Sequence, residues 1–276
     1  MSRKRWLVAH ERETVGIENT EDVREWLRVR RHTWANLVDL LKDTMAFDSS
    51  KRILDIGGGP TSIFLALREG ERYAVDPVYE HLFQLHPFMG EVEEYEGVNF
   101  IASPIEEVAF DKQFNLIFTI NAIDHVGELQ PVIKKIDELL APSGILVVIV
   151  DCYADSAVRN IINFFDADIP HPHHFITEDI IRLFPDYKLK KQDNKIFELI
   201  NEPAFRGRSS AIEIYRIDKF IARMRHNLKI WGKKGDTLFA LKFFLCYGLA
   251  LLIASIRKRE RQIHPLKKLR LFIFQR

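Results

Sequence analysis

The chain has 276 residues, 47% of them hydrophobic and 29% charged, a composition that excludes a disordered or fibrous protein. Its two cysteines, Cys152 and Cys246, have the spacing of neither a zinc site nor a disulfide framework, so we expect a reducing compartment. The net charge of +1 is unevenly distributed along the chain, because residues 216–276 hold 16 Lys and Arg against 3 Asp and Glu. The rest of the chain is acidic, which argues against binding of nucleic acid there.

The first predicted element is a helix over residues 20–43, within an N-terminal helical cap of residues 1–48. Thr20 is the expected N-cap, and apolar residues such as Val23 and Leu27 then recur at helical spacing. The residues before the helix are basic without a continuous apolar core, so we expect no secretory signal and a cytoplasmic location.

After the cap, short apolar strands alternate with helical segments. This alternation is typical of βαβ units and predicts a parallel sheet covered on both faces, in an α/β domain over residues 49–217. The predicted strands are 52–56, 71–75, 98–101, 115–120 and 145–151, with two further strands at 187–192 and 211–217.

A glycine-rich turn, Asp55-Ile-Gly57-Gly58-Gly59, closes the first strand. A dinucleotide-binding turn would need glycine where Ser62 stands, and a phosphate-binding loop would need a lysine that does not follow. The acid-x-Gly-x-Gly pattern is followed 21 residues after Asp55 by a second acid, Asp76, at the end of the second strand.

Taken in order, these motifs resemble the class I S-adenosylmethionine-dependent methyltransferases, in particular the type 11 group. The resemblance covers residues 50–155 as ordered motifs and extends more loosely to 217. Its later motifs are the turn 103–110, the post-strand segment FNLIFTINAIDHV and the run LLAPSGILVVIVD. It implies a Rossmann-like fold with a seven-stranded, mostly parallel sheet flanked by helices, and S-adenosyl-L-methionine as the cofactor.

The resemblance also implies which residues bind the cofactor. Asp76 would bind the ribose hydroxyls, because a carboxylate can accept from both of them. Many relatives carry an acid in the adenine turn where Pro104 stands, so adenine recognition would rest on backbone groups and on Ile105. The helix before the first strand often covers the pocket in this family. The expected cofactor-binding residues are Asp55, Gly57, Gly58, Gly59, Asp76, Pro77, Ser103, Pro104, Ile105 and Asn121.

The predicted acceptor side follows the fourth strand, because sites of open α/β sheets lie beyond the carboxyl ends of the strands. A hydroxyl acceptor must lose a proton, and an imidazole can accept it at neutral pH. We therefore predict His125 as the general base, with Asp124 as its orienter or as an alternative base. The alternative is that His125 caps the next helix or only lines the cofactor pocket.

A second cluster of histidines, His171, His173 and His174, follows the fifth strand. A loop at this place suits acceptor binding, and we expect these residues to contact the methyl acceptor. Pro172 favours an extended chain, in which His171 and His173 point one way and His174 the other. A structural or solvated role and a metal site are the competing interpretations. No acid or cysteine partner is identifiable by spacing, so we predict no metal.

The last segment, residues 218–276, is predicted to be a basic, apolar helical tail. Its stretch 237–256 is apolar apart from Lys242, but both flanks are basic, which disfavours a membrane span. We expect the tail to lie on an anionic membrane surface, and the final run HPLKKLRLFIFQR has the same basic and apolar mixture. Spanning the membrane, or packing on the domain or on a partner subunit of an oligomer, are the alternatives.

These features predict a methyltransferase that O-methylates a membrane-borne or lipid-linked acceptor, such as a saccharide, a lipid or a quinone-like ring, by in-line transfer. Two other functions stay open. The chain could be a non-catalytic scaffold that binds S-adenosylmethionine and recruits partners through its tail. It could also be a soluble small-molecule methyltransferase with a dimerising tail.

Overall fold

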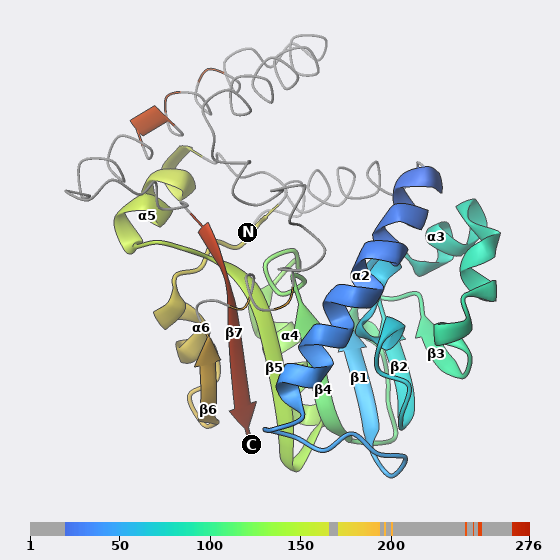
Figure 1. The fold of residues 1–276 in the computed structure, drawn as a ribbon. Helices are drawn as coiled ribbons and strands as arrows, with labels where there is room; N and C mark the ends of the chain where they lie inside the picture. The colour runs from blue at the N-terminus through green and yellow to red at the C-terminus, as the bar shows by residue number, and fades with distance from the viewer. Residues whose placement is uncertain are drawn as a thin grey trace.

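The fold is built on a seven-stranded sheet in the order β3-β2-β1-β4-β5-β7-β6 (Figure 1). The computed structural model describes residues 20–165, 171–193 and 267–276, together with Ile196, Ile200, Leu241, Leu245, Gly248 and Leu249. The strands are β1 (Arg52–Ile56), β2 (Glu71–Val75), β3 (Val98–Ile101), β4 (Phe114–Ile120), β5 (Leu140–Tyr153), β6 (Lys188–Asp193) and β7 (Lys267–Gln275).

The first five strands run parallel, and β7 lies antiparallel between β5 and β6. This confirms the predicted Rossmann-like fold with a mostly parallel sheet. The predicted fifth strand was too short, because β5 already begins at Leu140 and includes the Pro142–Gly144 stretch, where Ser143 has a φ of 61°.

Helices cover both faces of the sheet. The α-helices are α2 (Thr20–Leu41), α3 (Tyr79–Leu85), α4 (Leu129–Leu139), α5 (Ser156–Phe165) and α6 (Thr177–Leu183). Short 3₁₀ helices occupy the connections: η1 (Gly59–Thr61), η2 (Ile63–Leu65), η3 (Pro87–Glu91), η4 (Glu93–Tyr95) and η5 (Ile105–Glu107). The predicted N-terminal helix is therefore confirmed over residues 20–41 as α2, and the residues before Thr20 lie outside the described ones.

Two apolar cores result, one on each face, because successive strand residues point to opposite sides. In β1, Ile53 packs with residues of α2 and α3, whereas Leu54 packs with residues of α4 and α6. Because both faces of the sheet are covered, the parallel strands are continuous apolar runs in the sequence. Their carboxyl ends meet at one edge of the sheet.

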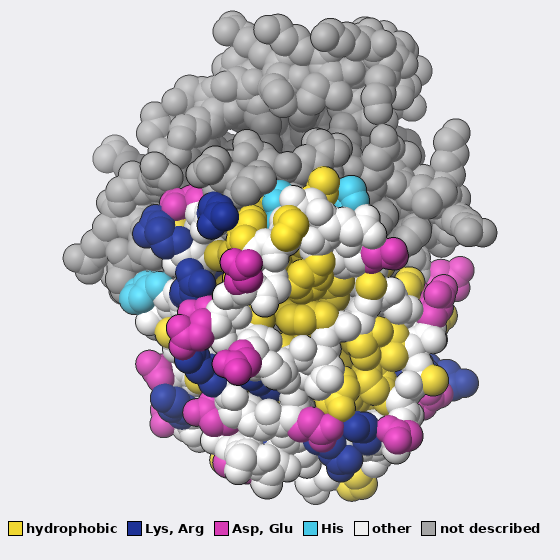
Figure 2. All heavy atoms as spheres, turned by 90° about the vertical axis from the view of Figure 1, so that its right-hand side faces the viewer, with side chains coloured by type: hydrophobic (Ala, Val, Ile, Leu, Met, Phe, Trp, Pro, Cys, Tyr) yellow, Lys and Arg dark blue, Asp and Glu magenta, His cyan; other side chains and the backbone are white. Residues whose placement is uncertain are grey.

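The edge of the sheet at β3 is short and rimmed by charge. Figure 2 views this end of the molecule, where apolar side chains gather in the middle of the face and Lys, Arg, Asp and Glu side chains are interspersed around them. Phe83, Phe88 and Phe100 are partly buried against the core, and Glu91 and Glu96 are exposed. A short strand beside charged side chains is a poor template for pairing with another chain.

The largest difference from the sequence analysis concerns the end of the chain. Residues 267–275, placed above in a tail outside the domain, form β7 in the interior of the sheet, where Leu271, Phe272, Ile273 and Phe274 are fully buried. The domain boundary at 217 is therefore wrong for this segment, and its apolar residues belong to the core. The predicted strand 211–217 and most of the tail lie outside the described residues.

Replacing Phe272 by alanine is expected to lower the free energy of unfolding by about 3–5 kcal/mol, the usual cost of emptying a buried aromatic site. Urea denaturation of the full chain measures this cost. Leu85→Ala is the control, because Leu85 is 41% exposed and should change stability by less than about 0.5 kcal/mol. An equally small effect of Phe272→Ala would contradict the central position of β7.

Candidate active site

A cavity of about 480 Å³ lies at the carboxyl ends of β1, β2 and β4. This volume is in the usual range for small-molecule sites, about 300–1,000 Å³. The cavity is lined by α2, by the glycine turn after β1, and by the turns after β2, β3 and β4. Its lining includes Trp26, Arg30, Trp34, Asp55, Gly57, Gly58, Gly59, Asp76, Pro77, Pro104, Ile105, Glu106, Asn121 and His125.

The glycines of the turn are required by close packing. Gly57 has a φ of +74°, and a Cβ there would lie 2.2 Å from the Cβ of Ala122. A Cβ on Gly58 would lie 2.5 Å from the hydroxyl of Tyr79. Neither position has room for a side chain, so the backbone itself forms this wall of the cavity.

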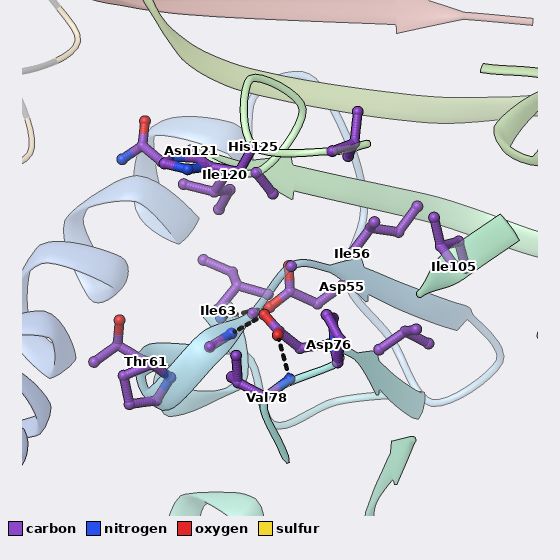
Figure 3. A pocket seen from close by; sticks show the side chains of 18 of the residues that line it. Asp55, Ile56, Thr61, Ile63, Asp76, Val78, Ile105, Ile120, Asn121 and His125 are labelled. Atoms are coloured by element: carbon purple, nitrogen blue, oxygen red, sulfur yellow. Dashed lines mark hydrogen bonds between the residues drawn. The ribbon is translucent and has the colours of Figure 1, made fainter. Parts of the chain in front are cut away.

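Asp55 is buried with half of its carboxylate unsatisfied. Its Oδ2 accepts hydrogen bonds from the Ser62 hydroxyl at 2.6 Å and from the Ile63 amide at 3.1 Å (Figure 3). Among the described residues, its Oδ1 has no hydrogen-bond partner. Burial, together with the nearby charge of Asp76, raises the pKa of Asp55 to about 6. An orphaned acceptor on the cavity wall fits a cationic ligand or one that donates hydrogen bonds.

Asp76 is held in a fixed orientation at the end of β2. Its Oδ2 accepts from the amide of Gly59 at 2.9 Å, and its Oδ1 accepts from the amide of Val78 at 3.0 Å. Because each carboxylate oxygen has two lone pairs, both can accept a further hydrogen bond. The geometry therefore fits the two hydroxyls of a ribose.

Helix α2 closes one side of the cavity. The indole Nε1 of Trp34 donates to the carbonyl of Thr61 at 2.6 Å, which ties the helix to the glycine turn. The guanidinium of Arg30 lies 4.9 Å from the Trp34 ring, and burial lowers its pKa. Trp26 and Arg30 line the cavity, whereas His32 is exposed on the helix. The N-terminal helix thus contributes a cation to the site.

The turn after β3 brings an acid that the sequence analysis missed. Pro104 and Ile105 line the cavity as expected, while the Ser103 hydroxyl donates to the carbonyl of Pro104 at 3.2 Å. Glu106 lies in the 3₁₀ helix η5 and also lines the cavity. Glu106 therefore brings a carboxylate into the cavity two residues after Pro104.

The opposite wall of the cavity is formed by the loop after β4, which carries Asn121 and His125 (Figure 3). Asn121 has a φ of 51°, a sparsely populated conformation for a residue other than glycine, and its amide donates to the carbonyl of Ile149 at 2.7 Å. The carboxylate of Asp124 is buried, and its Oδ1 lies 3.9 Å from Nε2 of His125. The structure thus places the two predicted catalytic residues beside each other, and of the two only His125 lines the cavity.

The second histidine cluster alternates as predicted. Nε2 of His171 lies 3.8 Å from Oδ2 of Asp124, and the imidazole of His173 is hydrogen-bonded to the carbonyl of Val126 at 2.9 Å. His174 points the other way and is hydrogen-bonded to Asn163 of α5. His171 therefore has an acidic partner, Asp124, which spacing did not identify. None of His171, His173 and His174 is among the described residues that line the cavity.

The parallel sheet, the glycine turn and the two acids at the strand ends define an α/β enzyme with a nucleoside-type cofactor site. Residues 47–197 match the protein family described as "Methyltransferase domain", so the chain belongs to this family, as a class I S-adenosylmethionine-dependent methyltransferase. S-adenosyl-L-methionine is its cofactor, and the orphaned Asp55 oxygen and the oriented Asp76 carboxylate are consistent with it.

Known proteins resemble this chain at low sequence identity. The ubiquinone biosynthesis O-methyltransferase of Rickettsia akari (strain Hartford) is 28% identical over 102 residues, which is 36% of this chain and 40% of that relative's length. The YcgJ protein of Bacillus subtilis has the same fold, with a TM-score of 0.55, 15% identity and coverage of 87% of this chain and 97% of that one. The O-methyltransferase region of StiE has a TM-score of 0.54 and 12% identity, with coverage of 87% and 72%.

Proposed function

We propose that this methyltransferase transfers a methyl group to a hydroxyl oxygen of an acceptor presented at a membrane surface, such as a lipid-linked saccharide, a lipid or a quinone-like ring. The observation that carries the proposal is the buried Asp124 beside His125, on the wall of the cavity opposite the cofactor acids Asp55 and Asp76. The named O-methyltransferase of ubiquinone biosynthesis supports oxygen as the acceptor atom.

Residues around the cavity would orient the cofactor. Asp76 accepts from the ribose hydroxyls, Glu106 from the adenine amino group, and Asp55 from the amino group of the methionine portion. Arg30 supplies a positive charge for the cofactor's carboxylate. When bound, the cofactor supplies a sulfonium methyl group, whose carbon bonds to the acceptor oxygen as the carbon–sulfur bond breaks and leaves its electron pair on sulfur.

His125 and Asp124 would handle the proton. His125 accepts the hydroxyl proton of the acceptor on its imidazole, and the Asp124 carboxylate 3.9 Å away stabilises the resulting positive charge. His125 lines the cavity, so the proton acceptor stands on the wall where the acceptor oxygen must approach the methyl group.

The membrane part of the proposal rests on the segment before β7. Leu241, Leu245 and Leu249 are helical, recur every four residues and are 55%, 60% and 43% exposed. Such a row on one helix face, in a segment rich in Lys and Arg, suits the surface of an anionic membrane. Among the described residues, no helix is both long and apolar enough to cross a bilayer.

The test uses the full chain, cofactor with a labelled methyl group, and a membrane lipid extract. We expect thermal stabilisation by the cofactor, and label in the organic phase as a base-stable ether. Label found only in basic nitrogen compounds, or no transfer despite cofactor binding, would contradict O-methylation, and the second result would favour a non-catalytic scaffold.

Vesicle co-sedimentation tests the membrane part separately. The full chain should bind vesicles of anionic phosphatidylglycerol, and replacing Leu241, Leu245 and Leu249 together by glutamate should weaken this binding by at least about tenfold, as loss of apolar burial predicts. Leu85→Glu is the matched control, since Leu85 is an exposed leucine of α3 on the body of the protein. A wild-type chain that stays in the supernatant would favour a water-soluble acceptor and a dimerising tail.

A further inference from the structure

Three side chains from two distant segments converge beside the cavity. Asp124 and His125 come from the loop after β4, and His171 comes from the loop that precedes α6. Each contributes one metal-binding atom, and the three atoms lie within 4.8 Å of one another. The His125 and His171 rings are 4.6 Å apart between centroids.

The spacing of these groups leaves room for an ion between them. Nε2 of His125 and Nε2 of His171 lie 3.9 and 3.8 Å from the two oxygens of Asp124, which is too long for hydrogen bonds. Because the three donor atoms lie within 4.8 Å of one another, a point between them lies within about 2.8 Å of all three, and small side-chain rotations would shorten this to the bond lengths of about 2.0 to 2.2 Å that zinc makes to nitrogen and oxygen.

Asp124 supplies an independent indication of a ligand. Its side chain is 4% exposed, and its Oδ1 has no hydrogen-bond partner among the described residues. A buried carboxylate oxygen without a donor is costly unless a cation or a donor binds it. The oxygen lies 3.9 Å from Nε2 of His125, and such a cation would lie between these two atoms.

The surrounding backbone holds the cluster together. The amide of His173 donates to the carbonyl of Asp124 at 3.1 Å, and the His173 imidazole is hydrogen-bonded to the carbonyl of Val126. The amide of His125 donates to the carbonyl of Ala122 at 3.0 Å. The two bonds of His173 join the loop after β4 to the loop before α6 directly at the cluster. His173 therefore holds the three side chains of the cluster close together.

We infer that Asp124, His125 and His171 bind a divalent transition-metal ion of the Zn²⁺ or Co²⁺ type. Two imidazoles and one carboxylate favour such an ion over Mg²⁺ or Ca²⁺, which prefer oxygen ligands. Three protein ligands leave a coordination position open, as in catalytic rather than structural zinc sites. Because His125 lines the cavity, that position is available to an acceptor oxygen.

The metal site adds to the proposed function. Only the role of the metal ion in catalysis rests on that proposed function, and metal binding does not. In the metal-free protein, His125 takes the acceptor's proton. A bound ion occupies that imidazole instead and lowers the pKa of a coordinated hydroxyl, whose proton then leaves to water. Metal binding itself needs neither cofactor nor acceptor, so its failure and that of methyl transfer can be told apart.

The test titrates Co²⁺ into the metal-stripped full chain and follows its visible absorption. We expect one strong site per chain, with an intense band typical of low coordination number, displaced by Zn²⁺ and not by Mg²⁺. His171→Ala and Asp124→Asn should each weaken Co²⁺ binding by at least about tenfold. His81→Ala, an exposed histidine of α3, should leave it unchanged.

Circular dichroism and cofactor titration show whether each variant is folded. His171→Ala that binds cofactor normally and loses the cobalt band would support the site. Absence of the band in the wild-type chain would overturn the inference, as would a band of unchanged strength in folded His171→Ala.

Discussion

Replacing His125 by alanine is expected to lower the turnover of methyl transfer by about 10²- to 10⁴-fold, the usual contribution of a positioned general base. Cofactor affinity should change little, because the cofactor acid Asp55 lies in β1 and Asp76 directly follows β2, whereas His125 stands on the opposite wall. The measurement is turnover at saturating cofactor and acceptor, with cofactor binding determined separately by titration.

Chemical rescue separates a proton acceptor from a residue that only shapes the cavity. Added imidazole should restore part of the activity of His125→Ala, because it supplies the missing proton acceptor. His81→Ala is the matched control and should behave as wild type. A His125→Ala variant with wild-type turnover would remove His125 from the mechanism.

The parallel part of the fold was predictable because its signals are local. β1, β2 and β3 are short apolar runs ended by turn residues, and the structure gives them the predicted bounds. β7 was not predictable in this way. The run KKLRLFIFQ mixes cations with apolar residues, as an interfacial segment does, and only its pairing with β5 and β6 marks it as a central strand.

The same distinction holds for the site. Asp55 and Asp76 were identifiable because each lies at the end of a strand, Asp55 within β1 and Asp76 just after β2, in a compact motif. The contact of His171 with Asp124 joins residues 47 positions apart, and it depends on the packing of two loops beyond β4 and β5. Sequence spacing found no acid for the histidines, because the acid comes from another segment. Non-local contacts of this kind set the chemistry of the acceptor side.

Replacing Asp55 by asparagine is expected to stabilise the cofactor-free protein at pH 7 while weakening cofactor binding. Burial raises the pKa of Asp55 to about 6 in the folded chain, above its ordinary value of 3.8. A raised pKa means that the folded state binds the proton more tightly, so this carboxyl favours folding below about pH 4, and that contribution is lost as the pH rises through 6. The loss amounts to about 3 kcal/mol at pH 7.

The neutral amide removes this cost but also weakens the hydrogen bonds from Ser62 and Ile63. We therefore expect a net gain of about 1–2 kcal/mol at pH 7. Urea denaturation at pH 5 and pH 7 measures it, and the stability difference between these two pH values should shrink in the variant. Asp43→Asn is the control, since Asp43 is exposed. A less stable Asp55→Asn with unchanged pH dependence would contradict the argument.

Cofactor binding should respond in the opposite direction. The cationic amino and sulfonium groups of the cofactor favour an ionised Asp55, and a charged hydrogen bond contributes about 1.5–3 kcal/mol, so Asp55→Asn should weaken binding by about 10- to 100-fold. Wild-type affinity should also fall below pH 6, where Asp55 takes up a proton in the free protein. The ionised Asp55, with its unpaired oxygen, thus lowers the stability of the cofactor-free protein and strengthens the binding of a cationic cofactor.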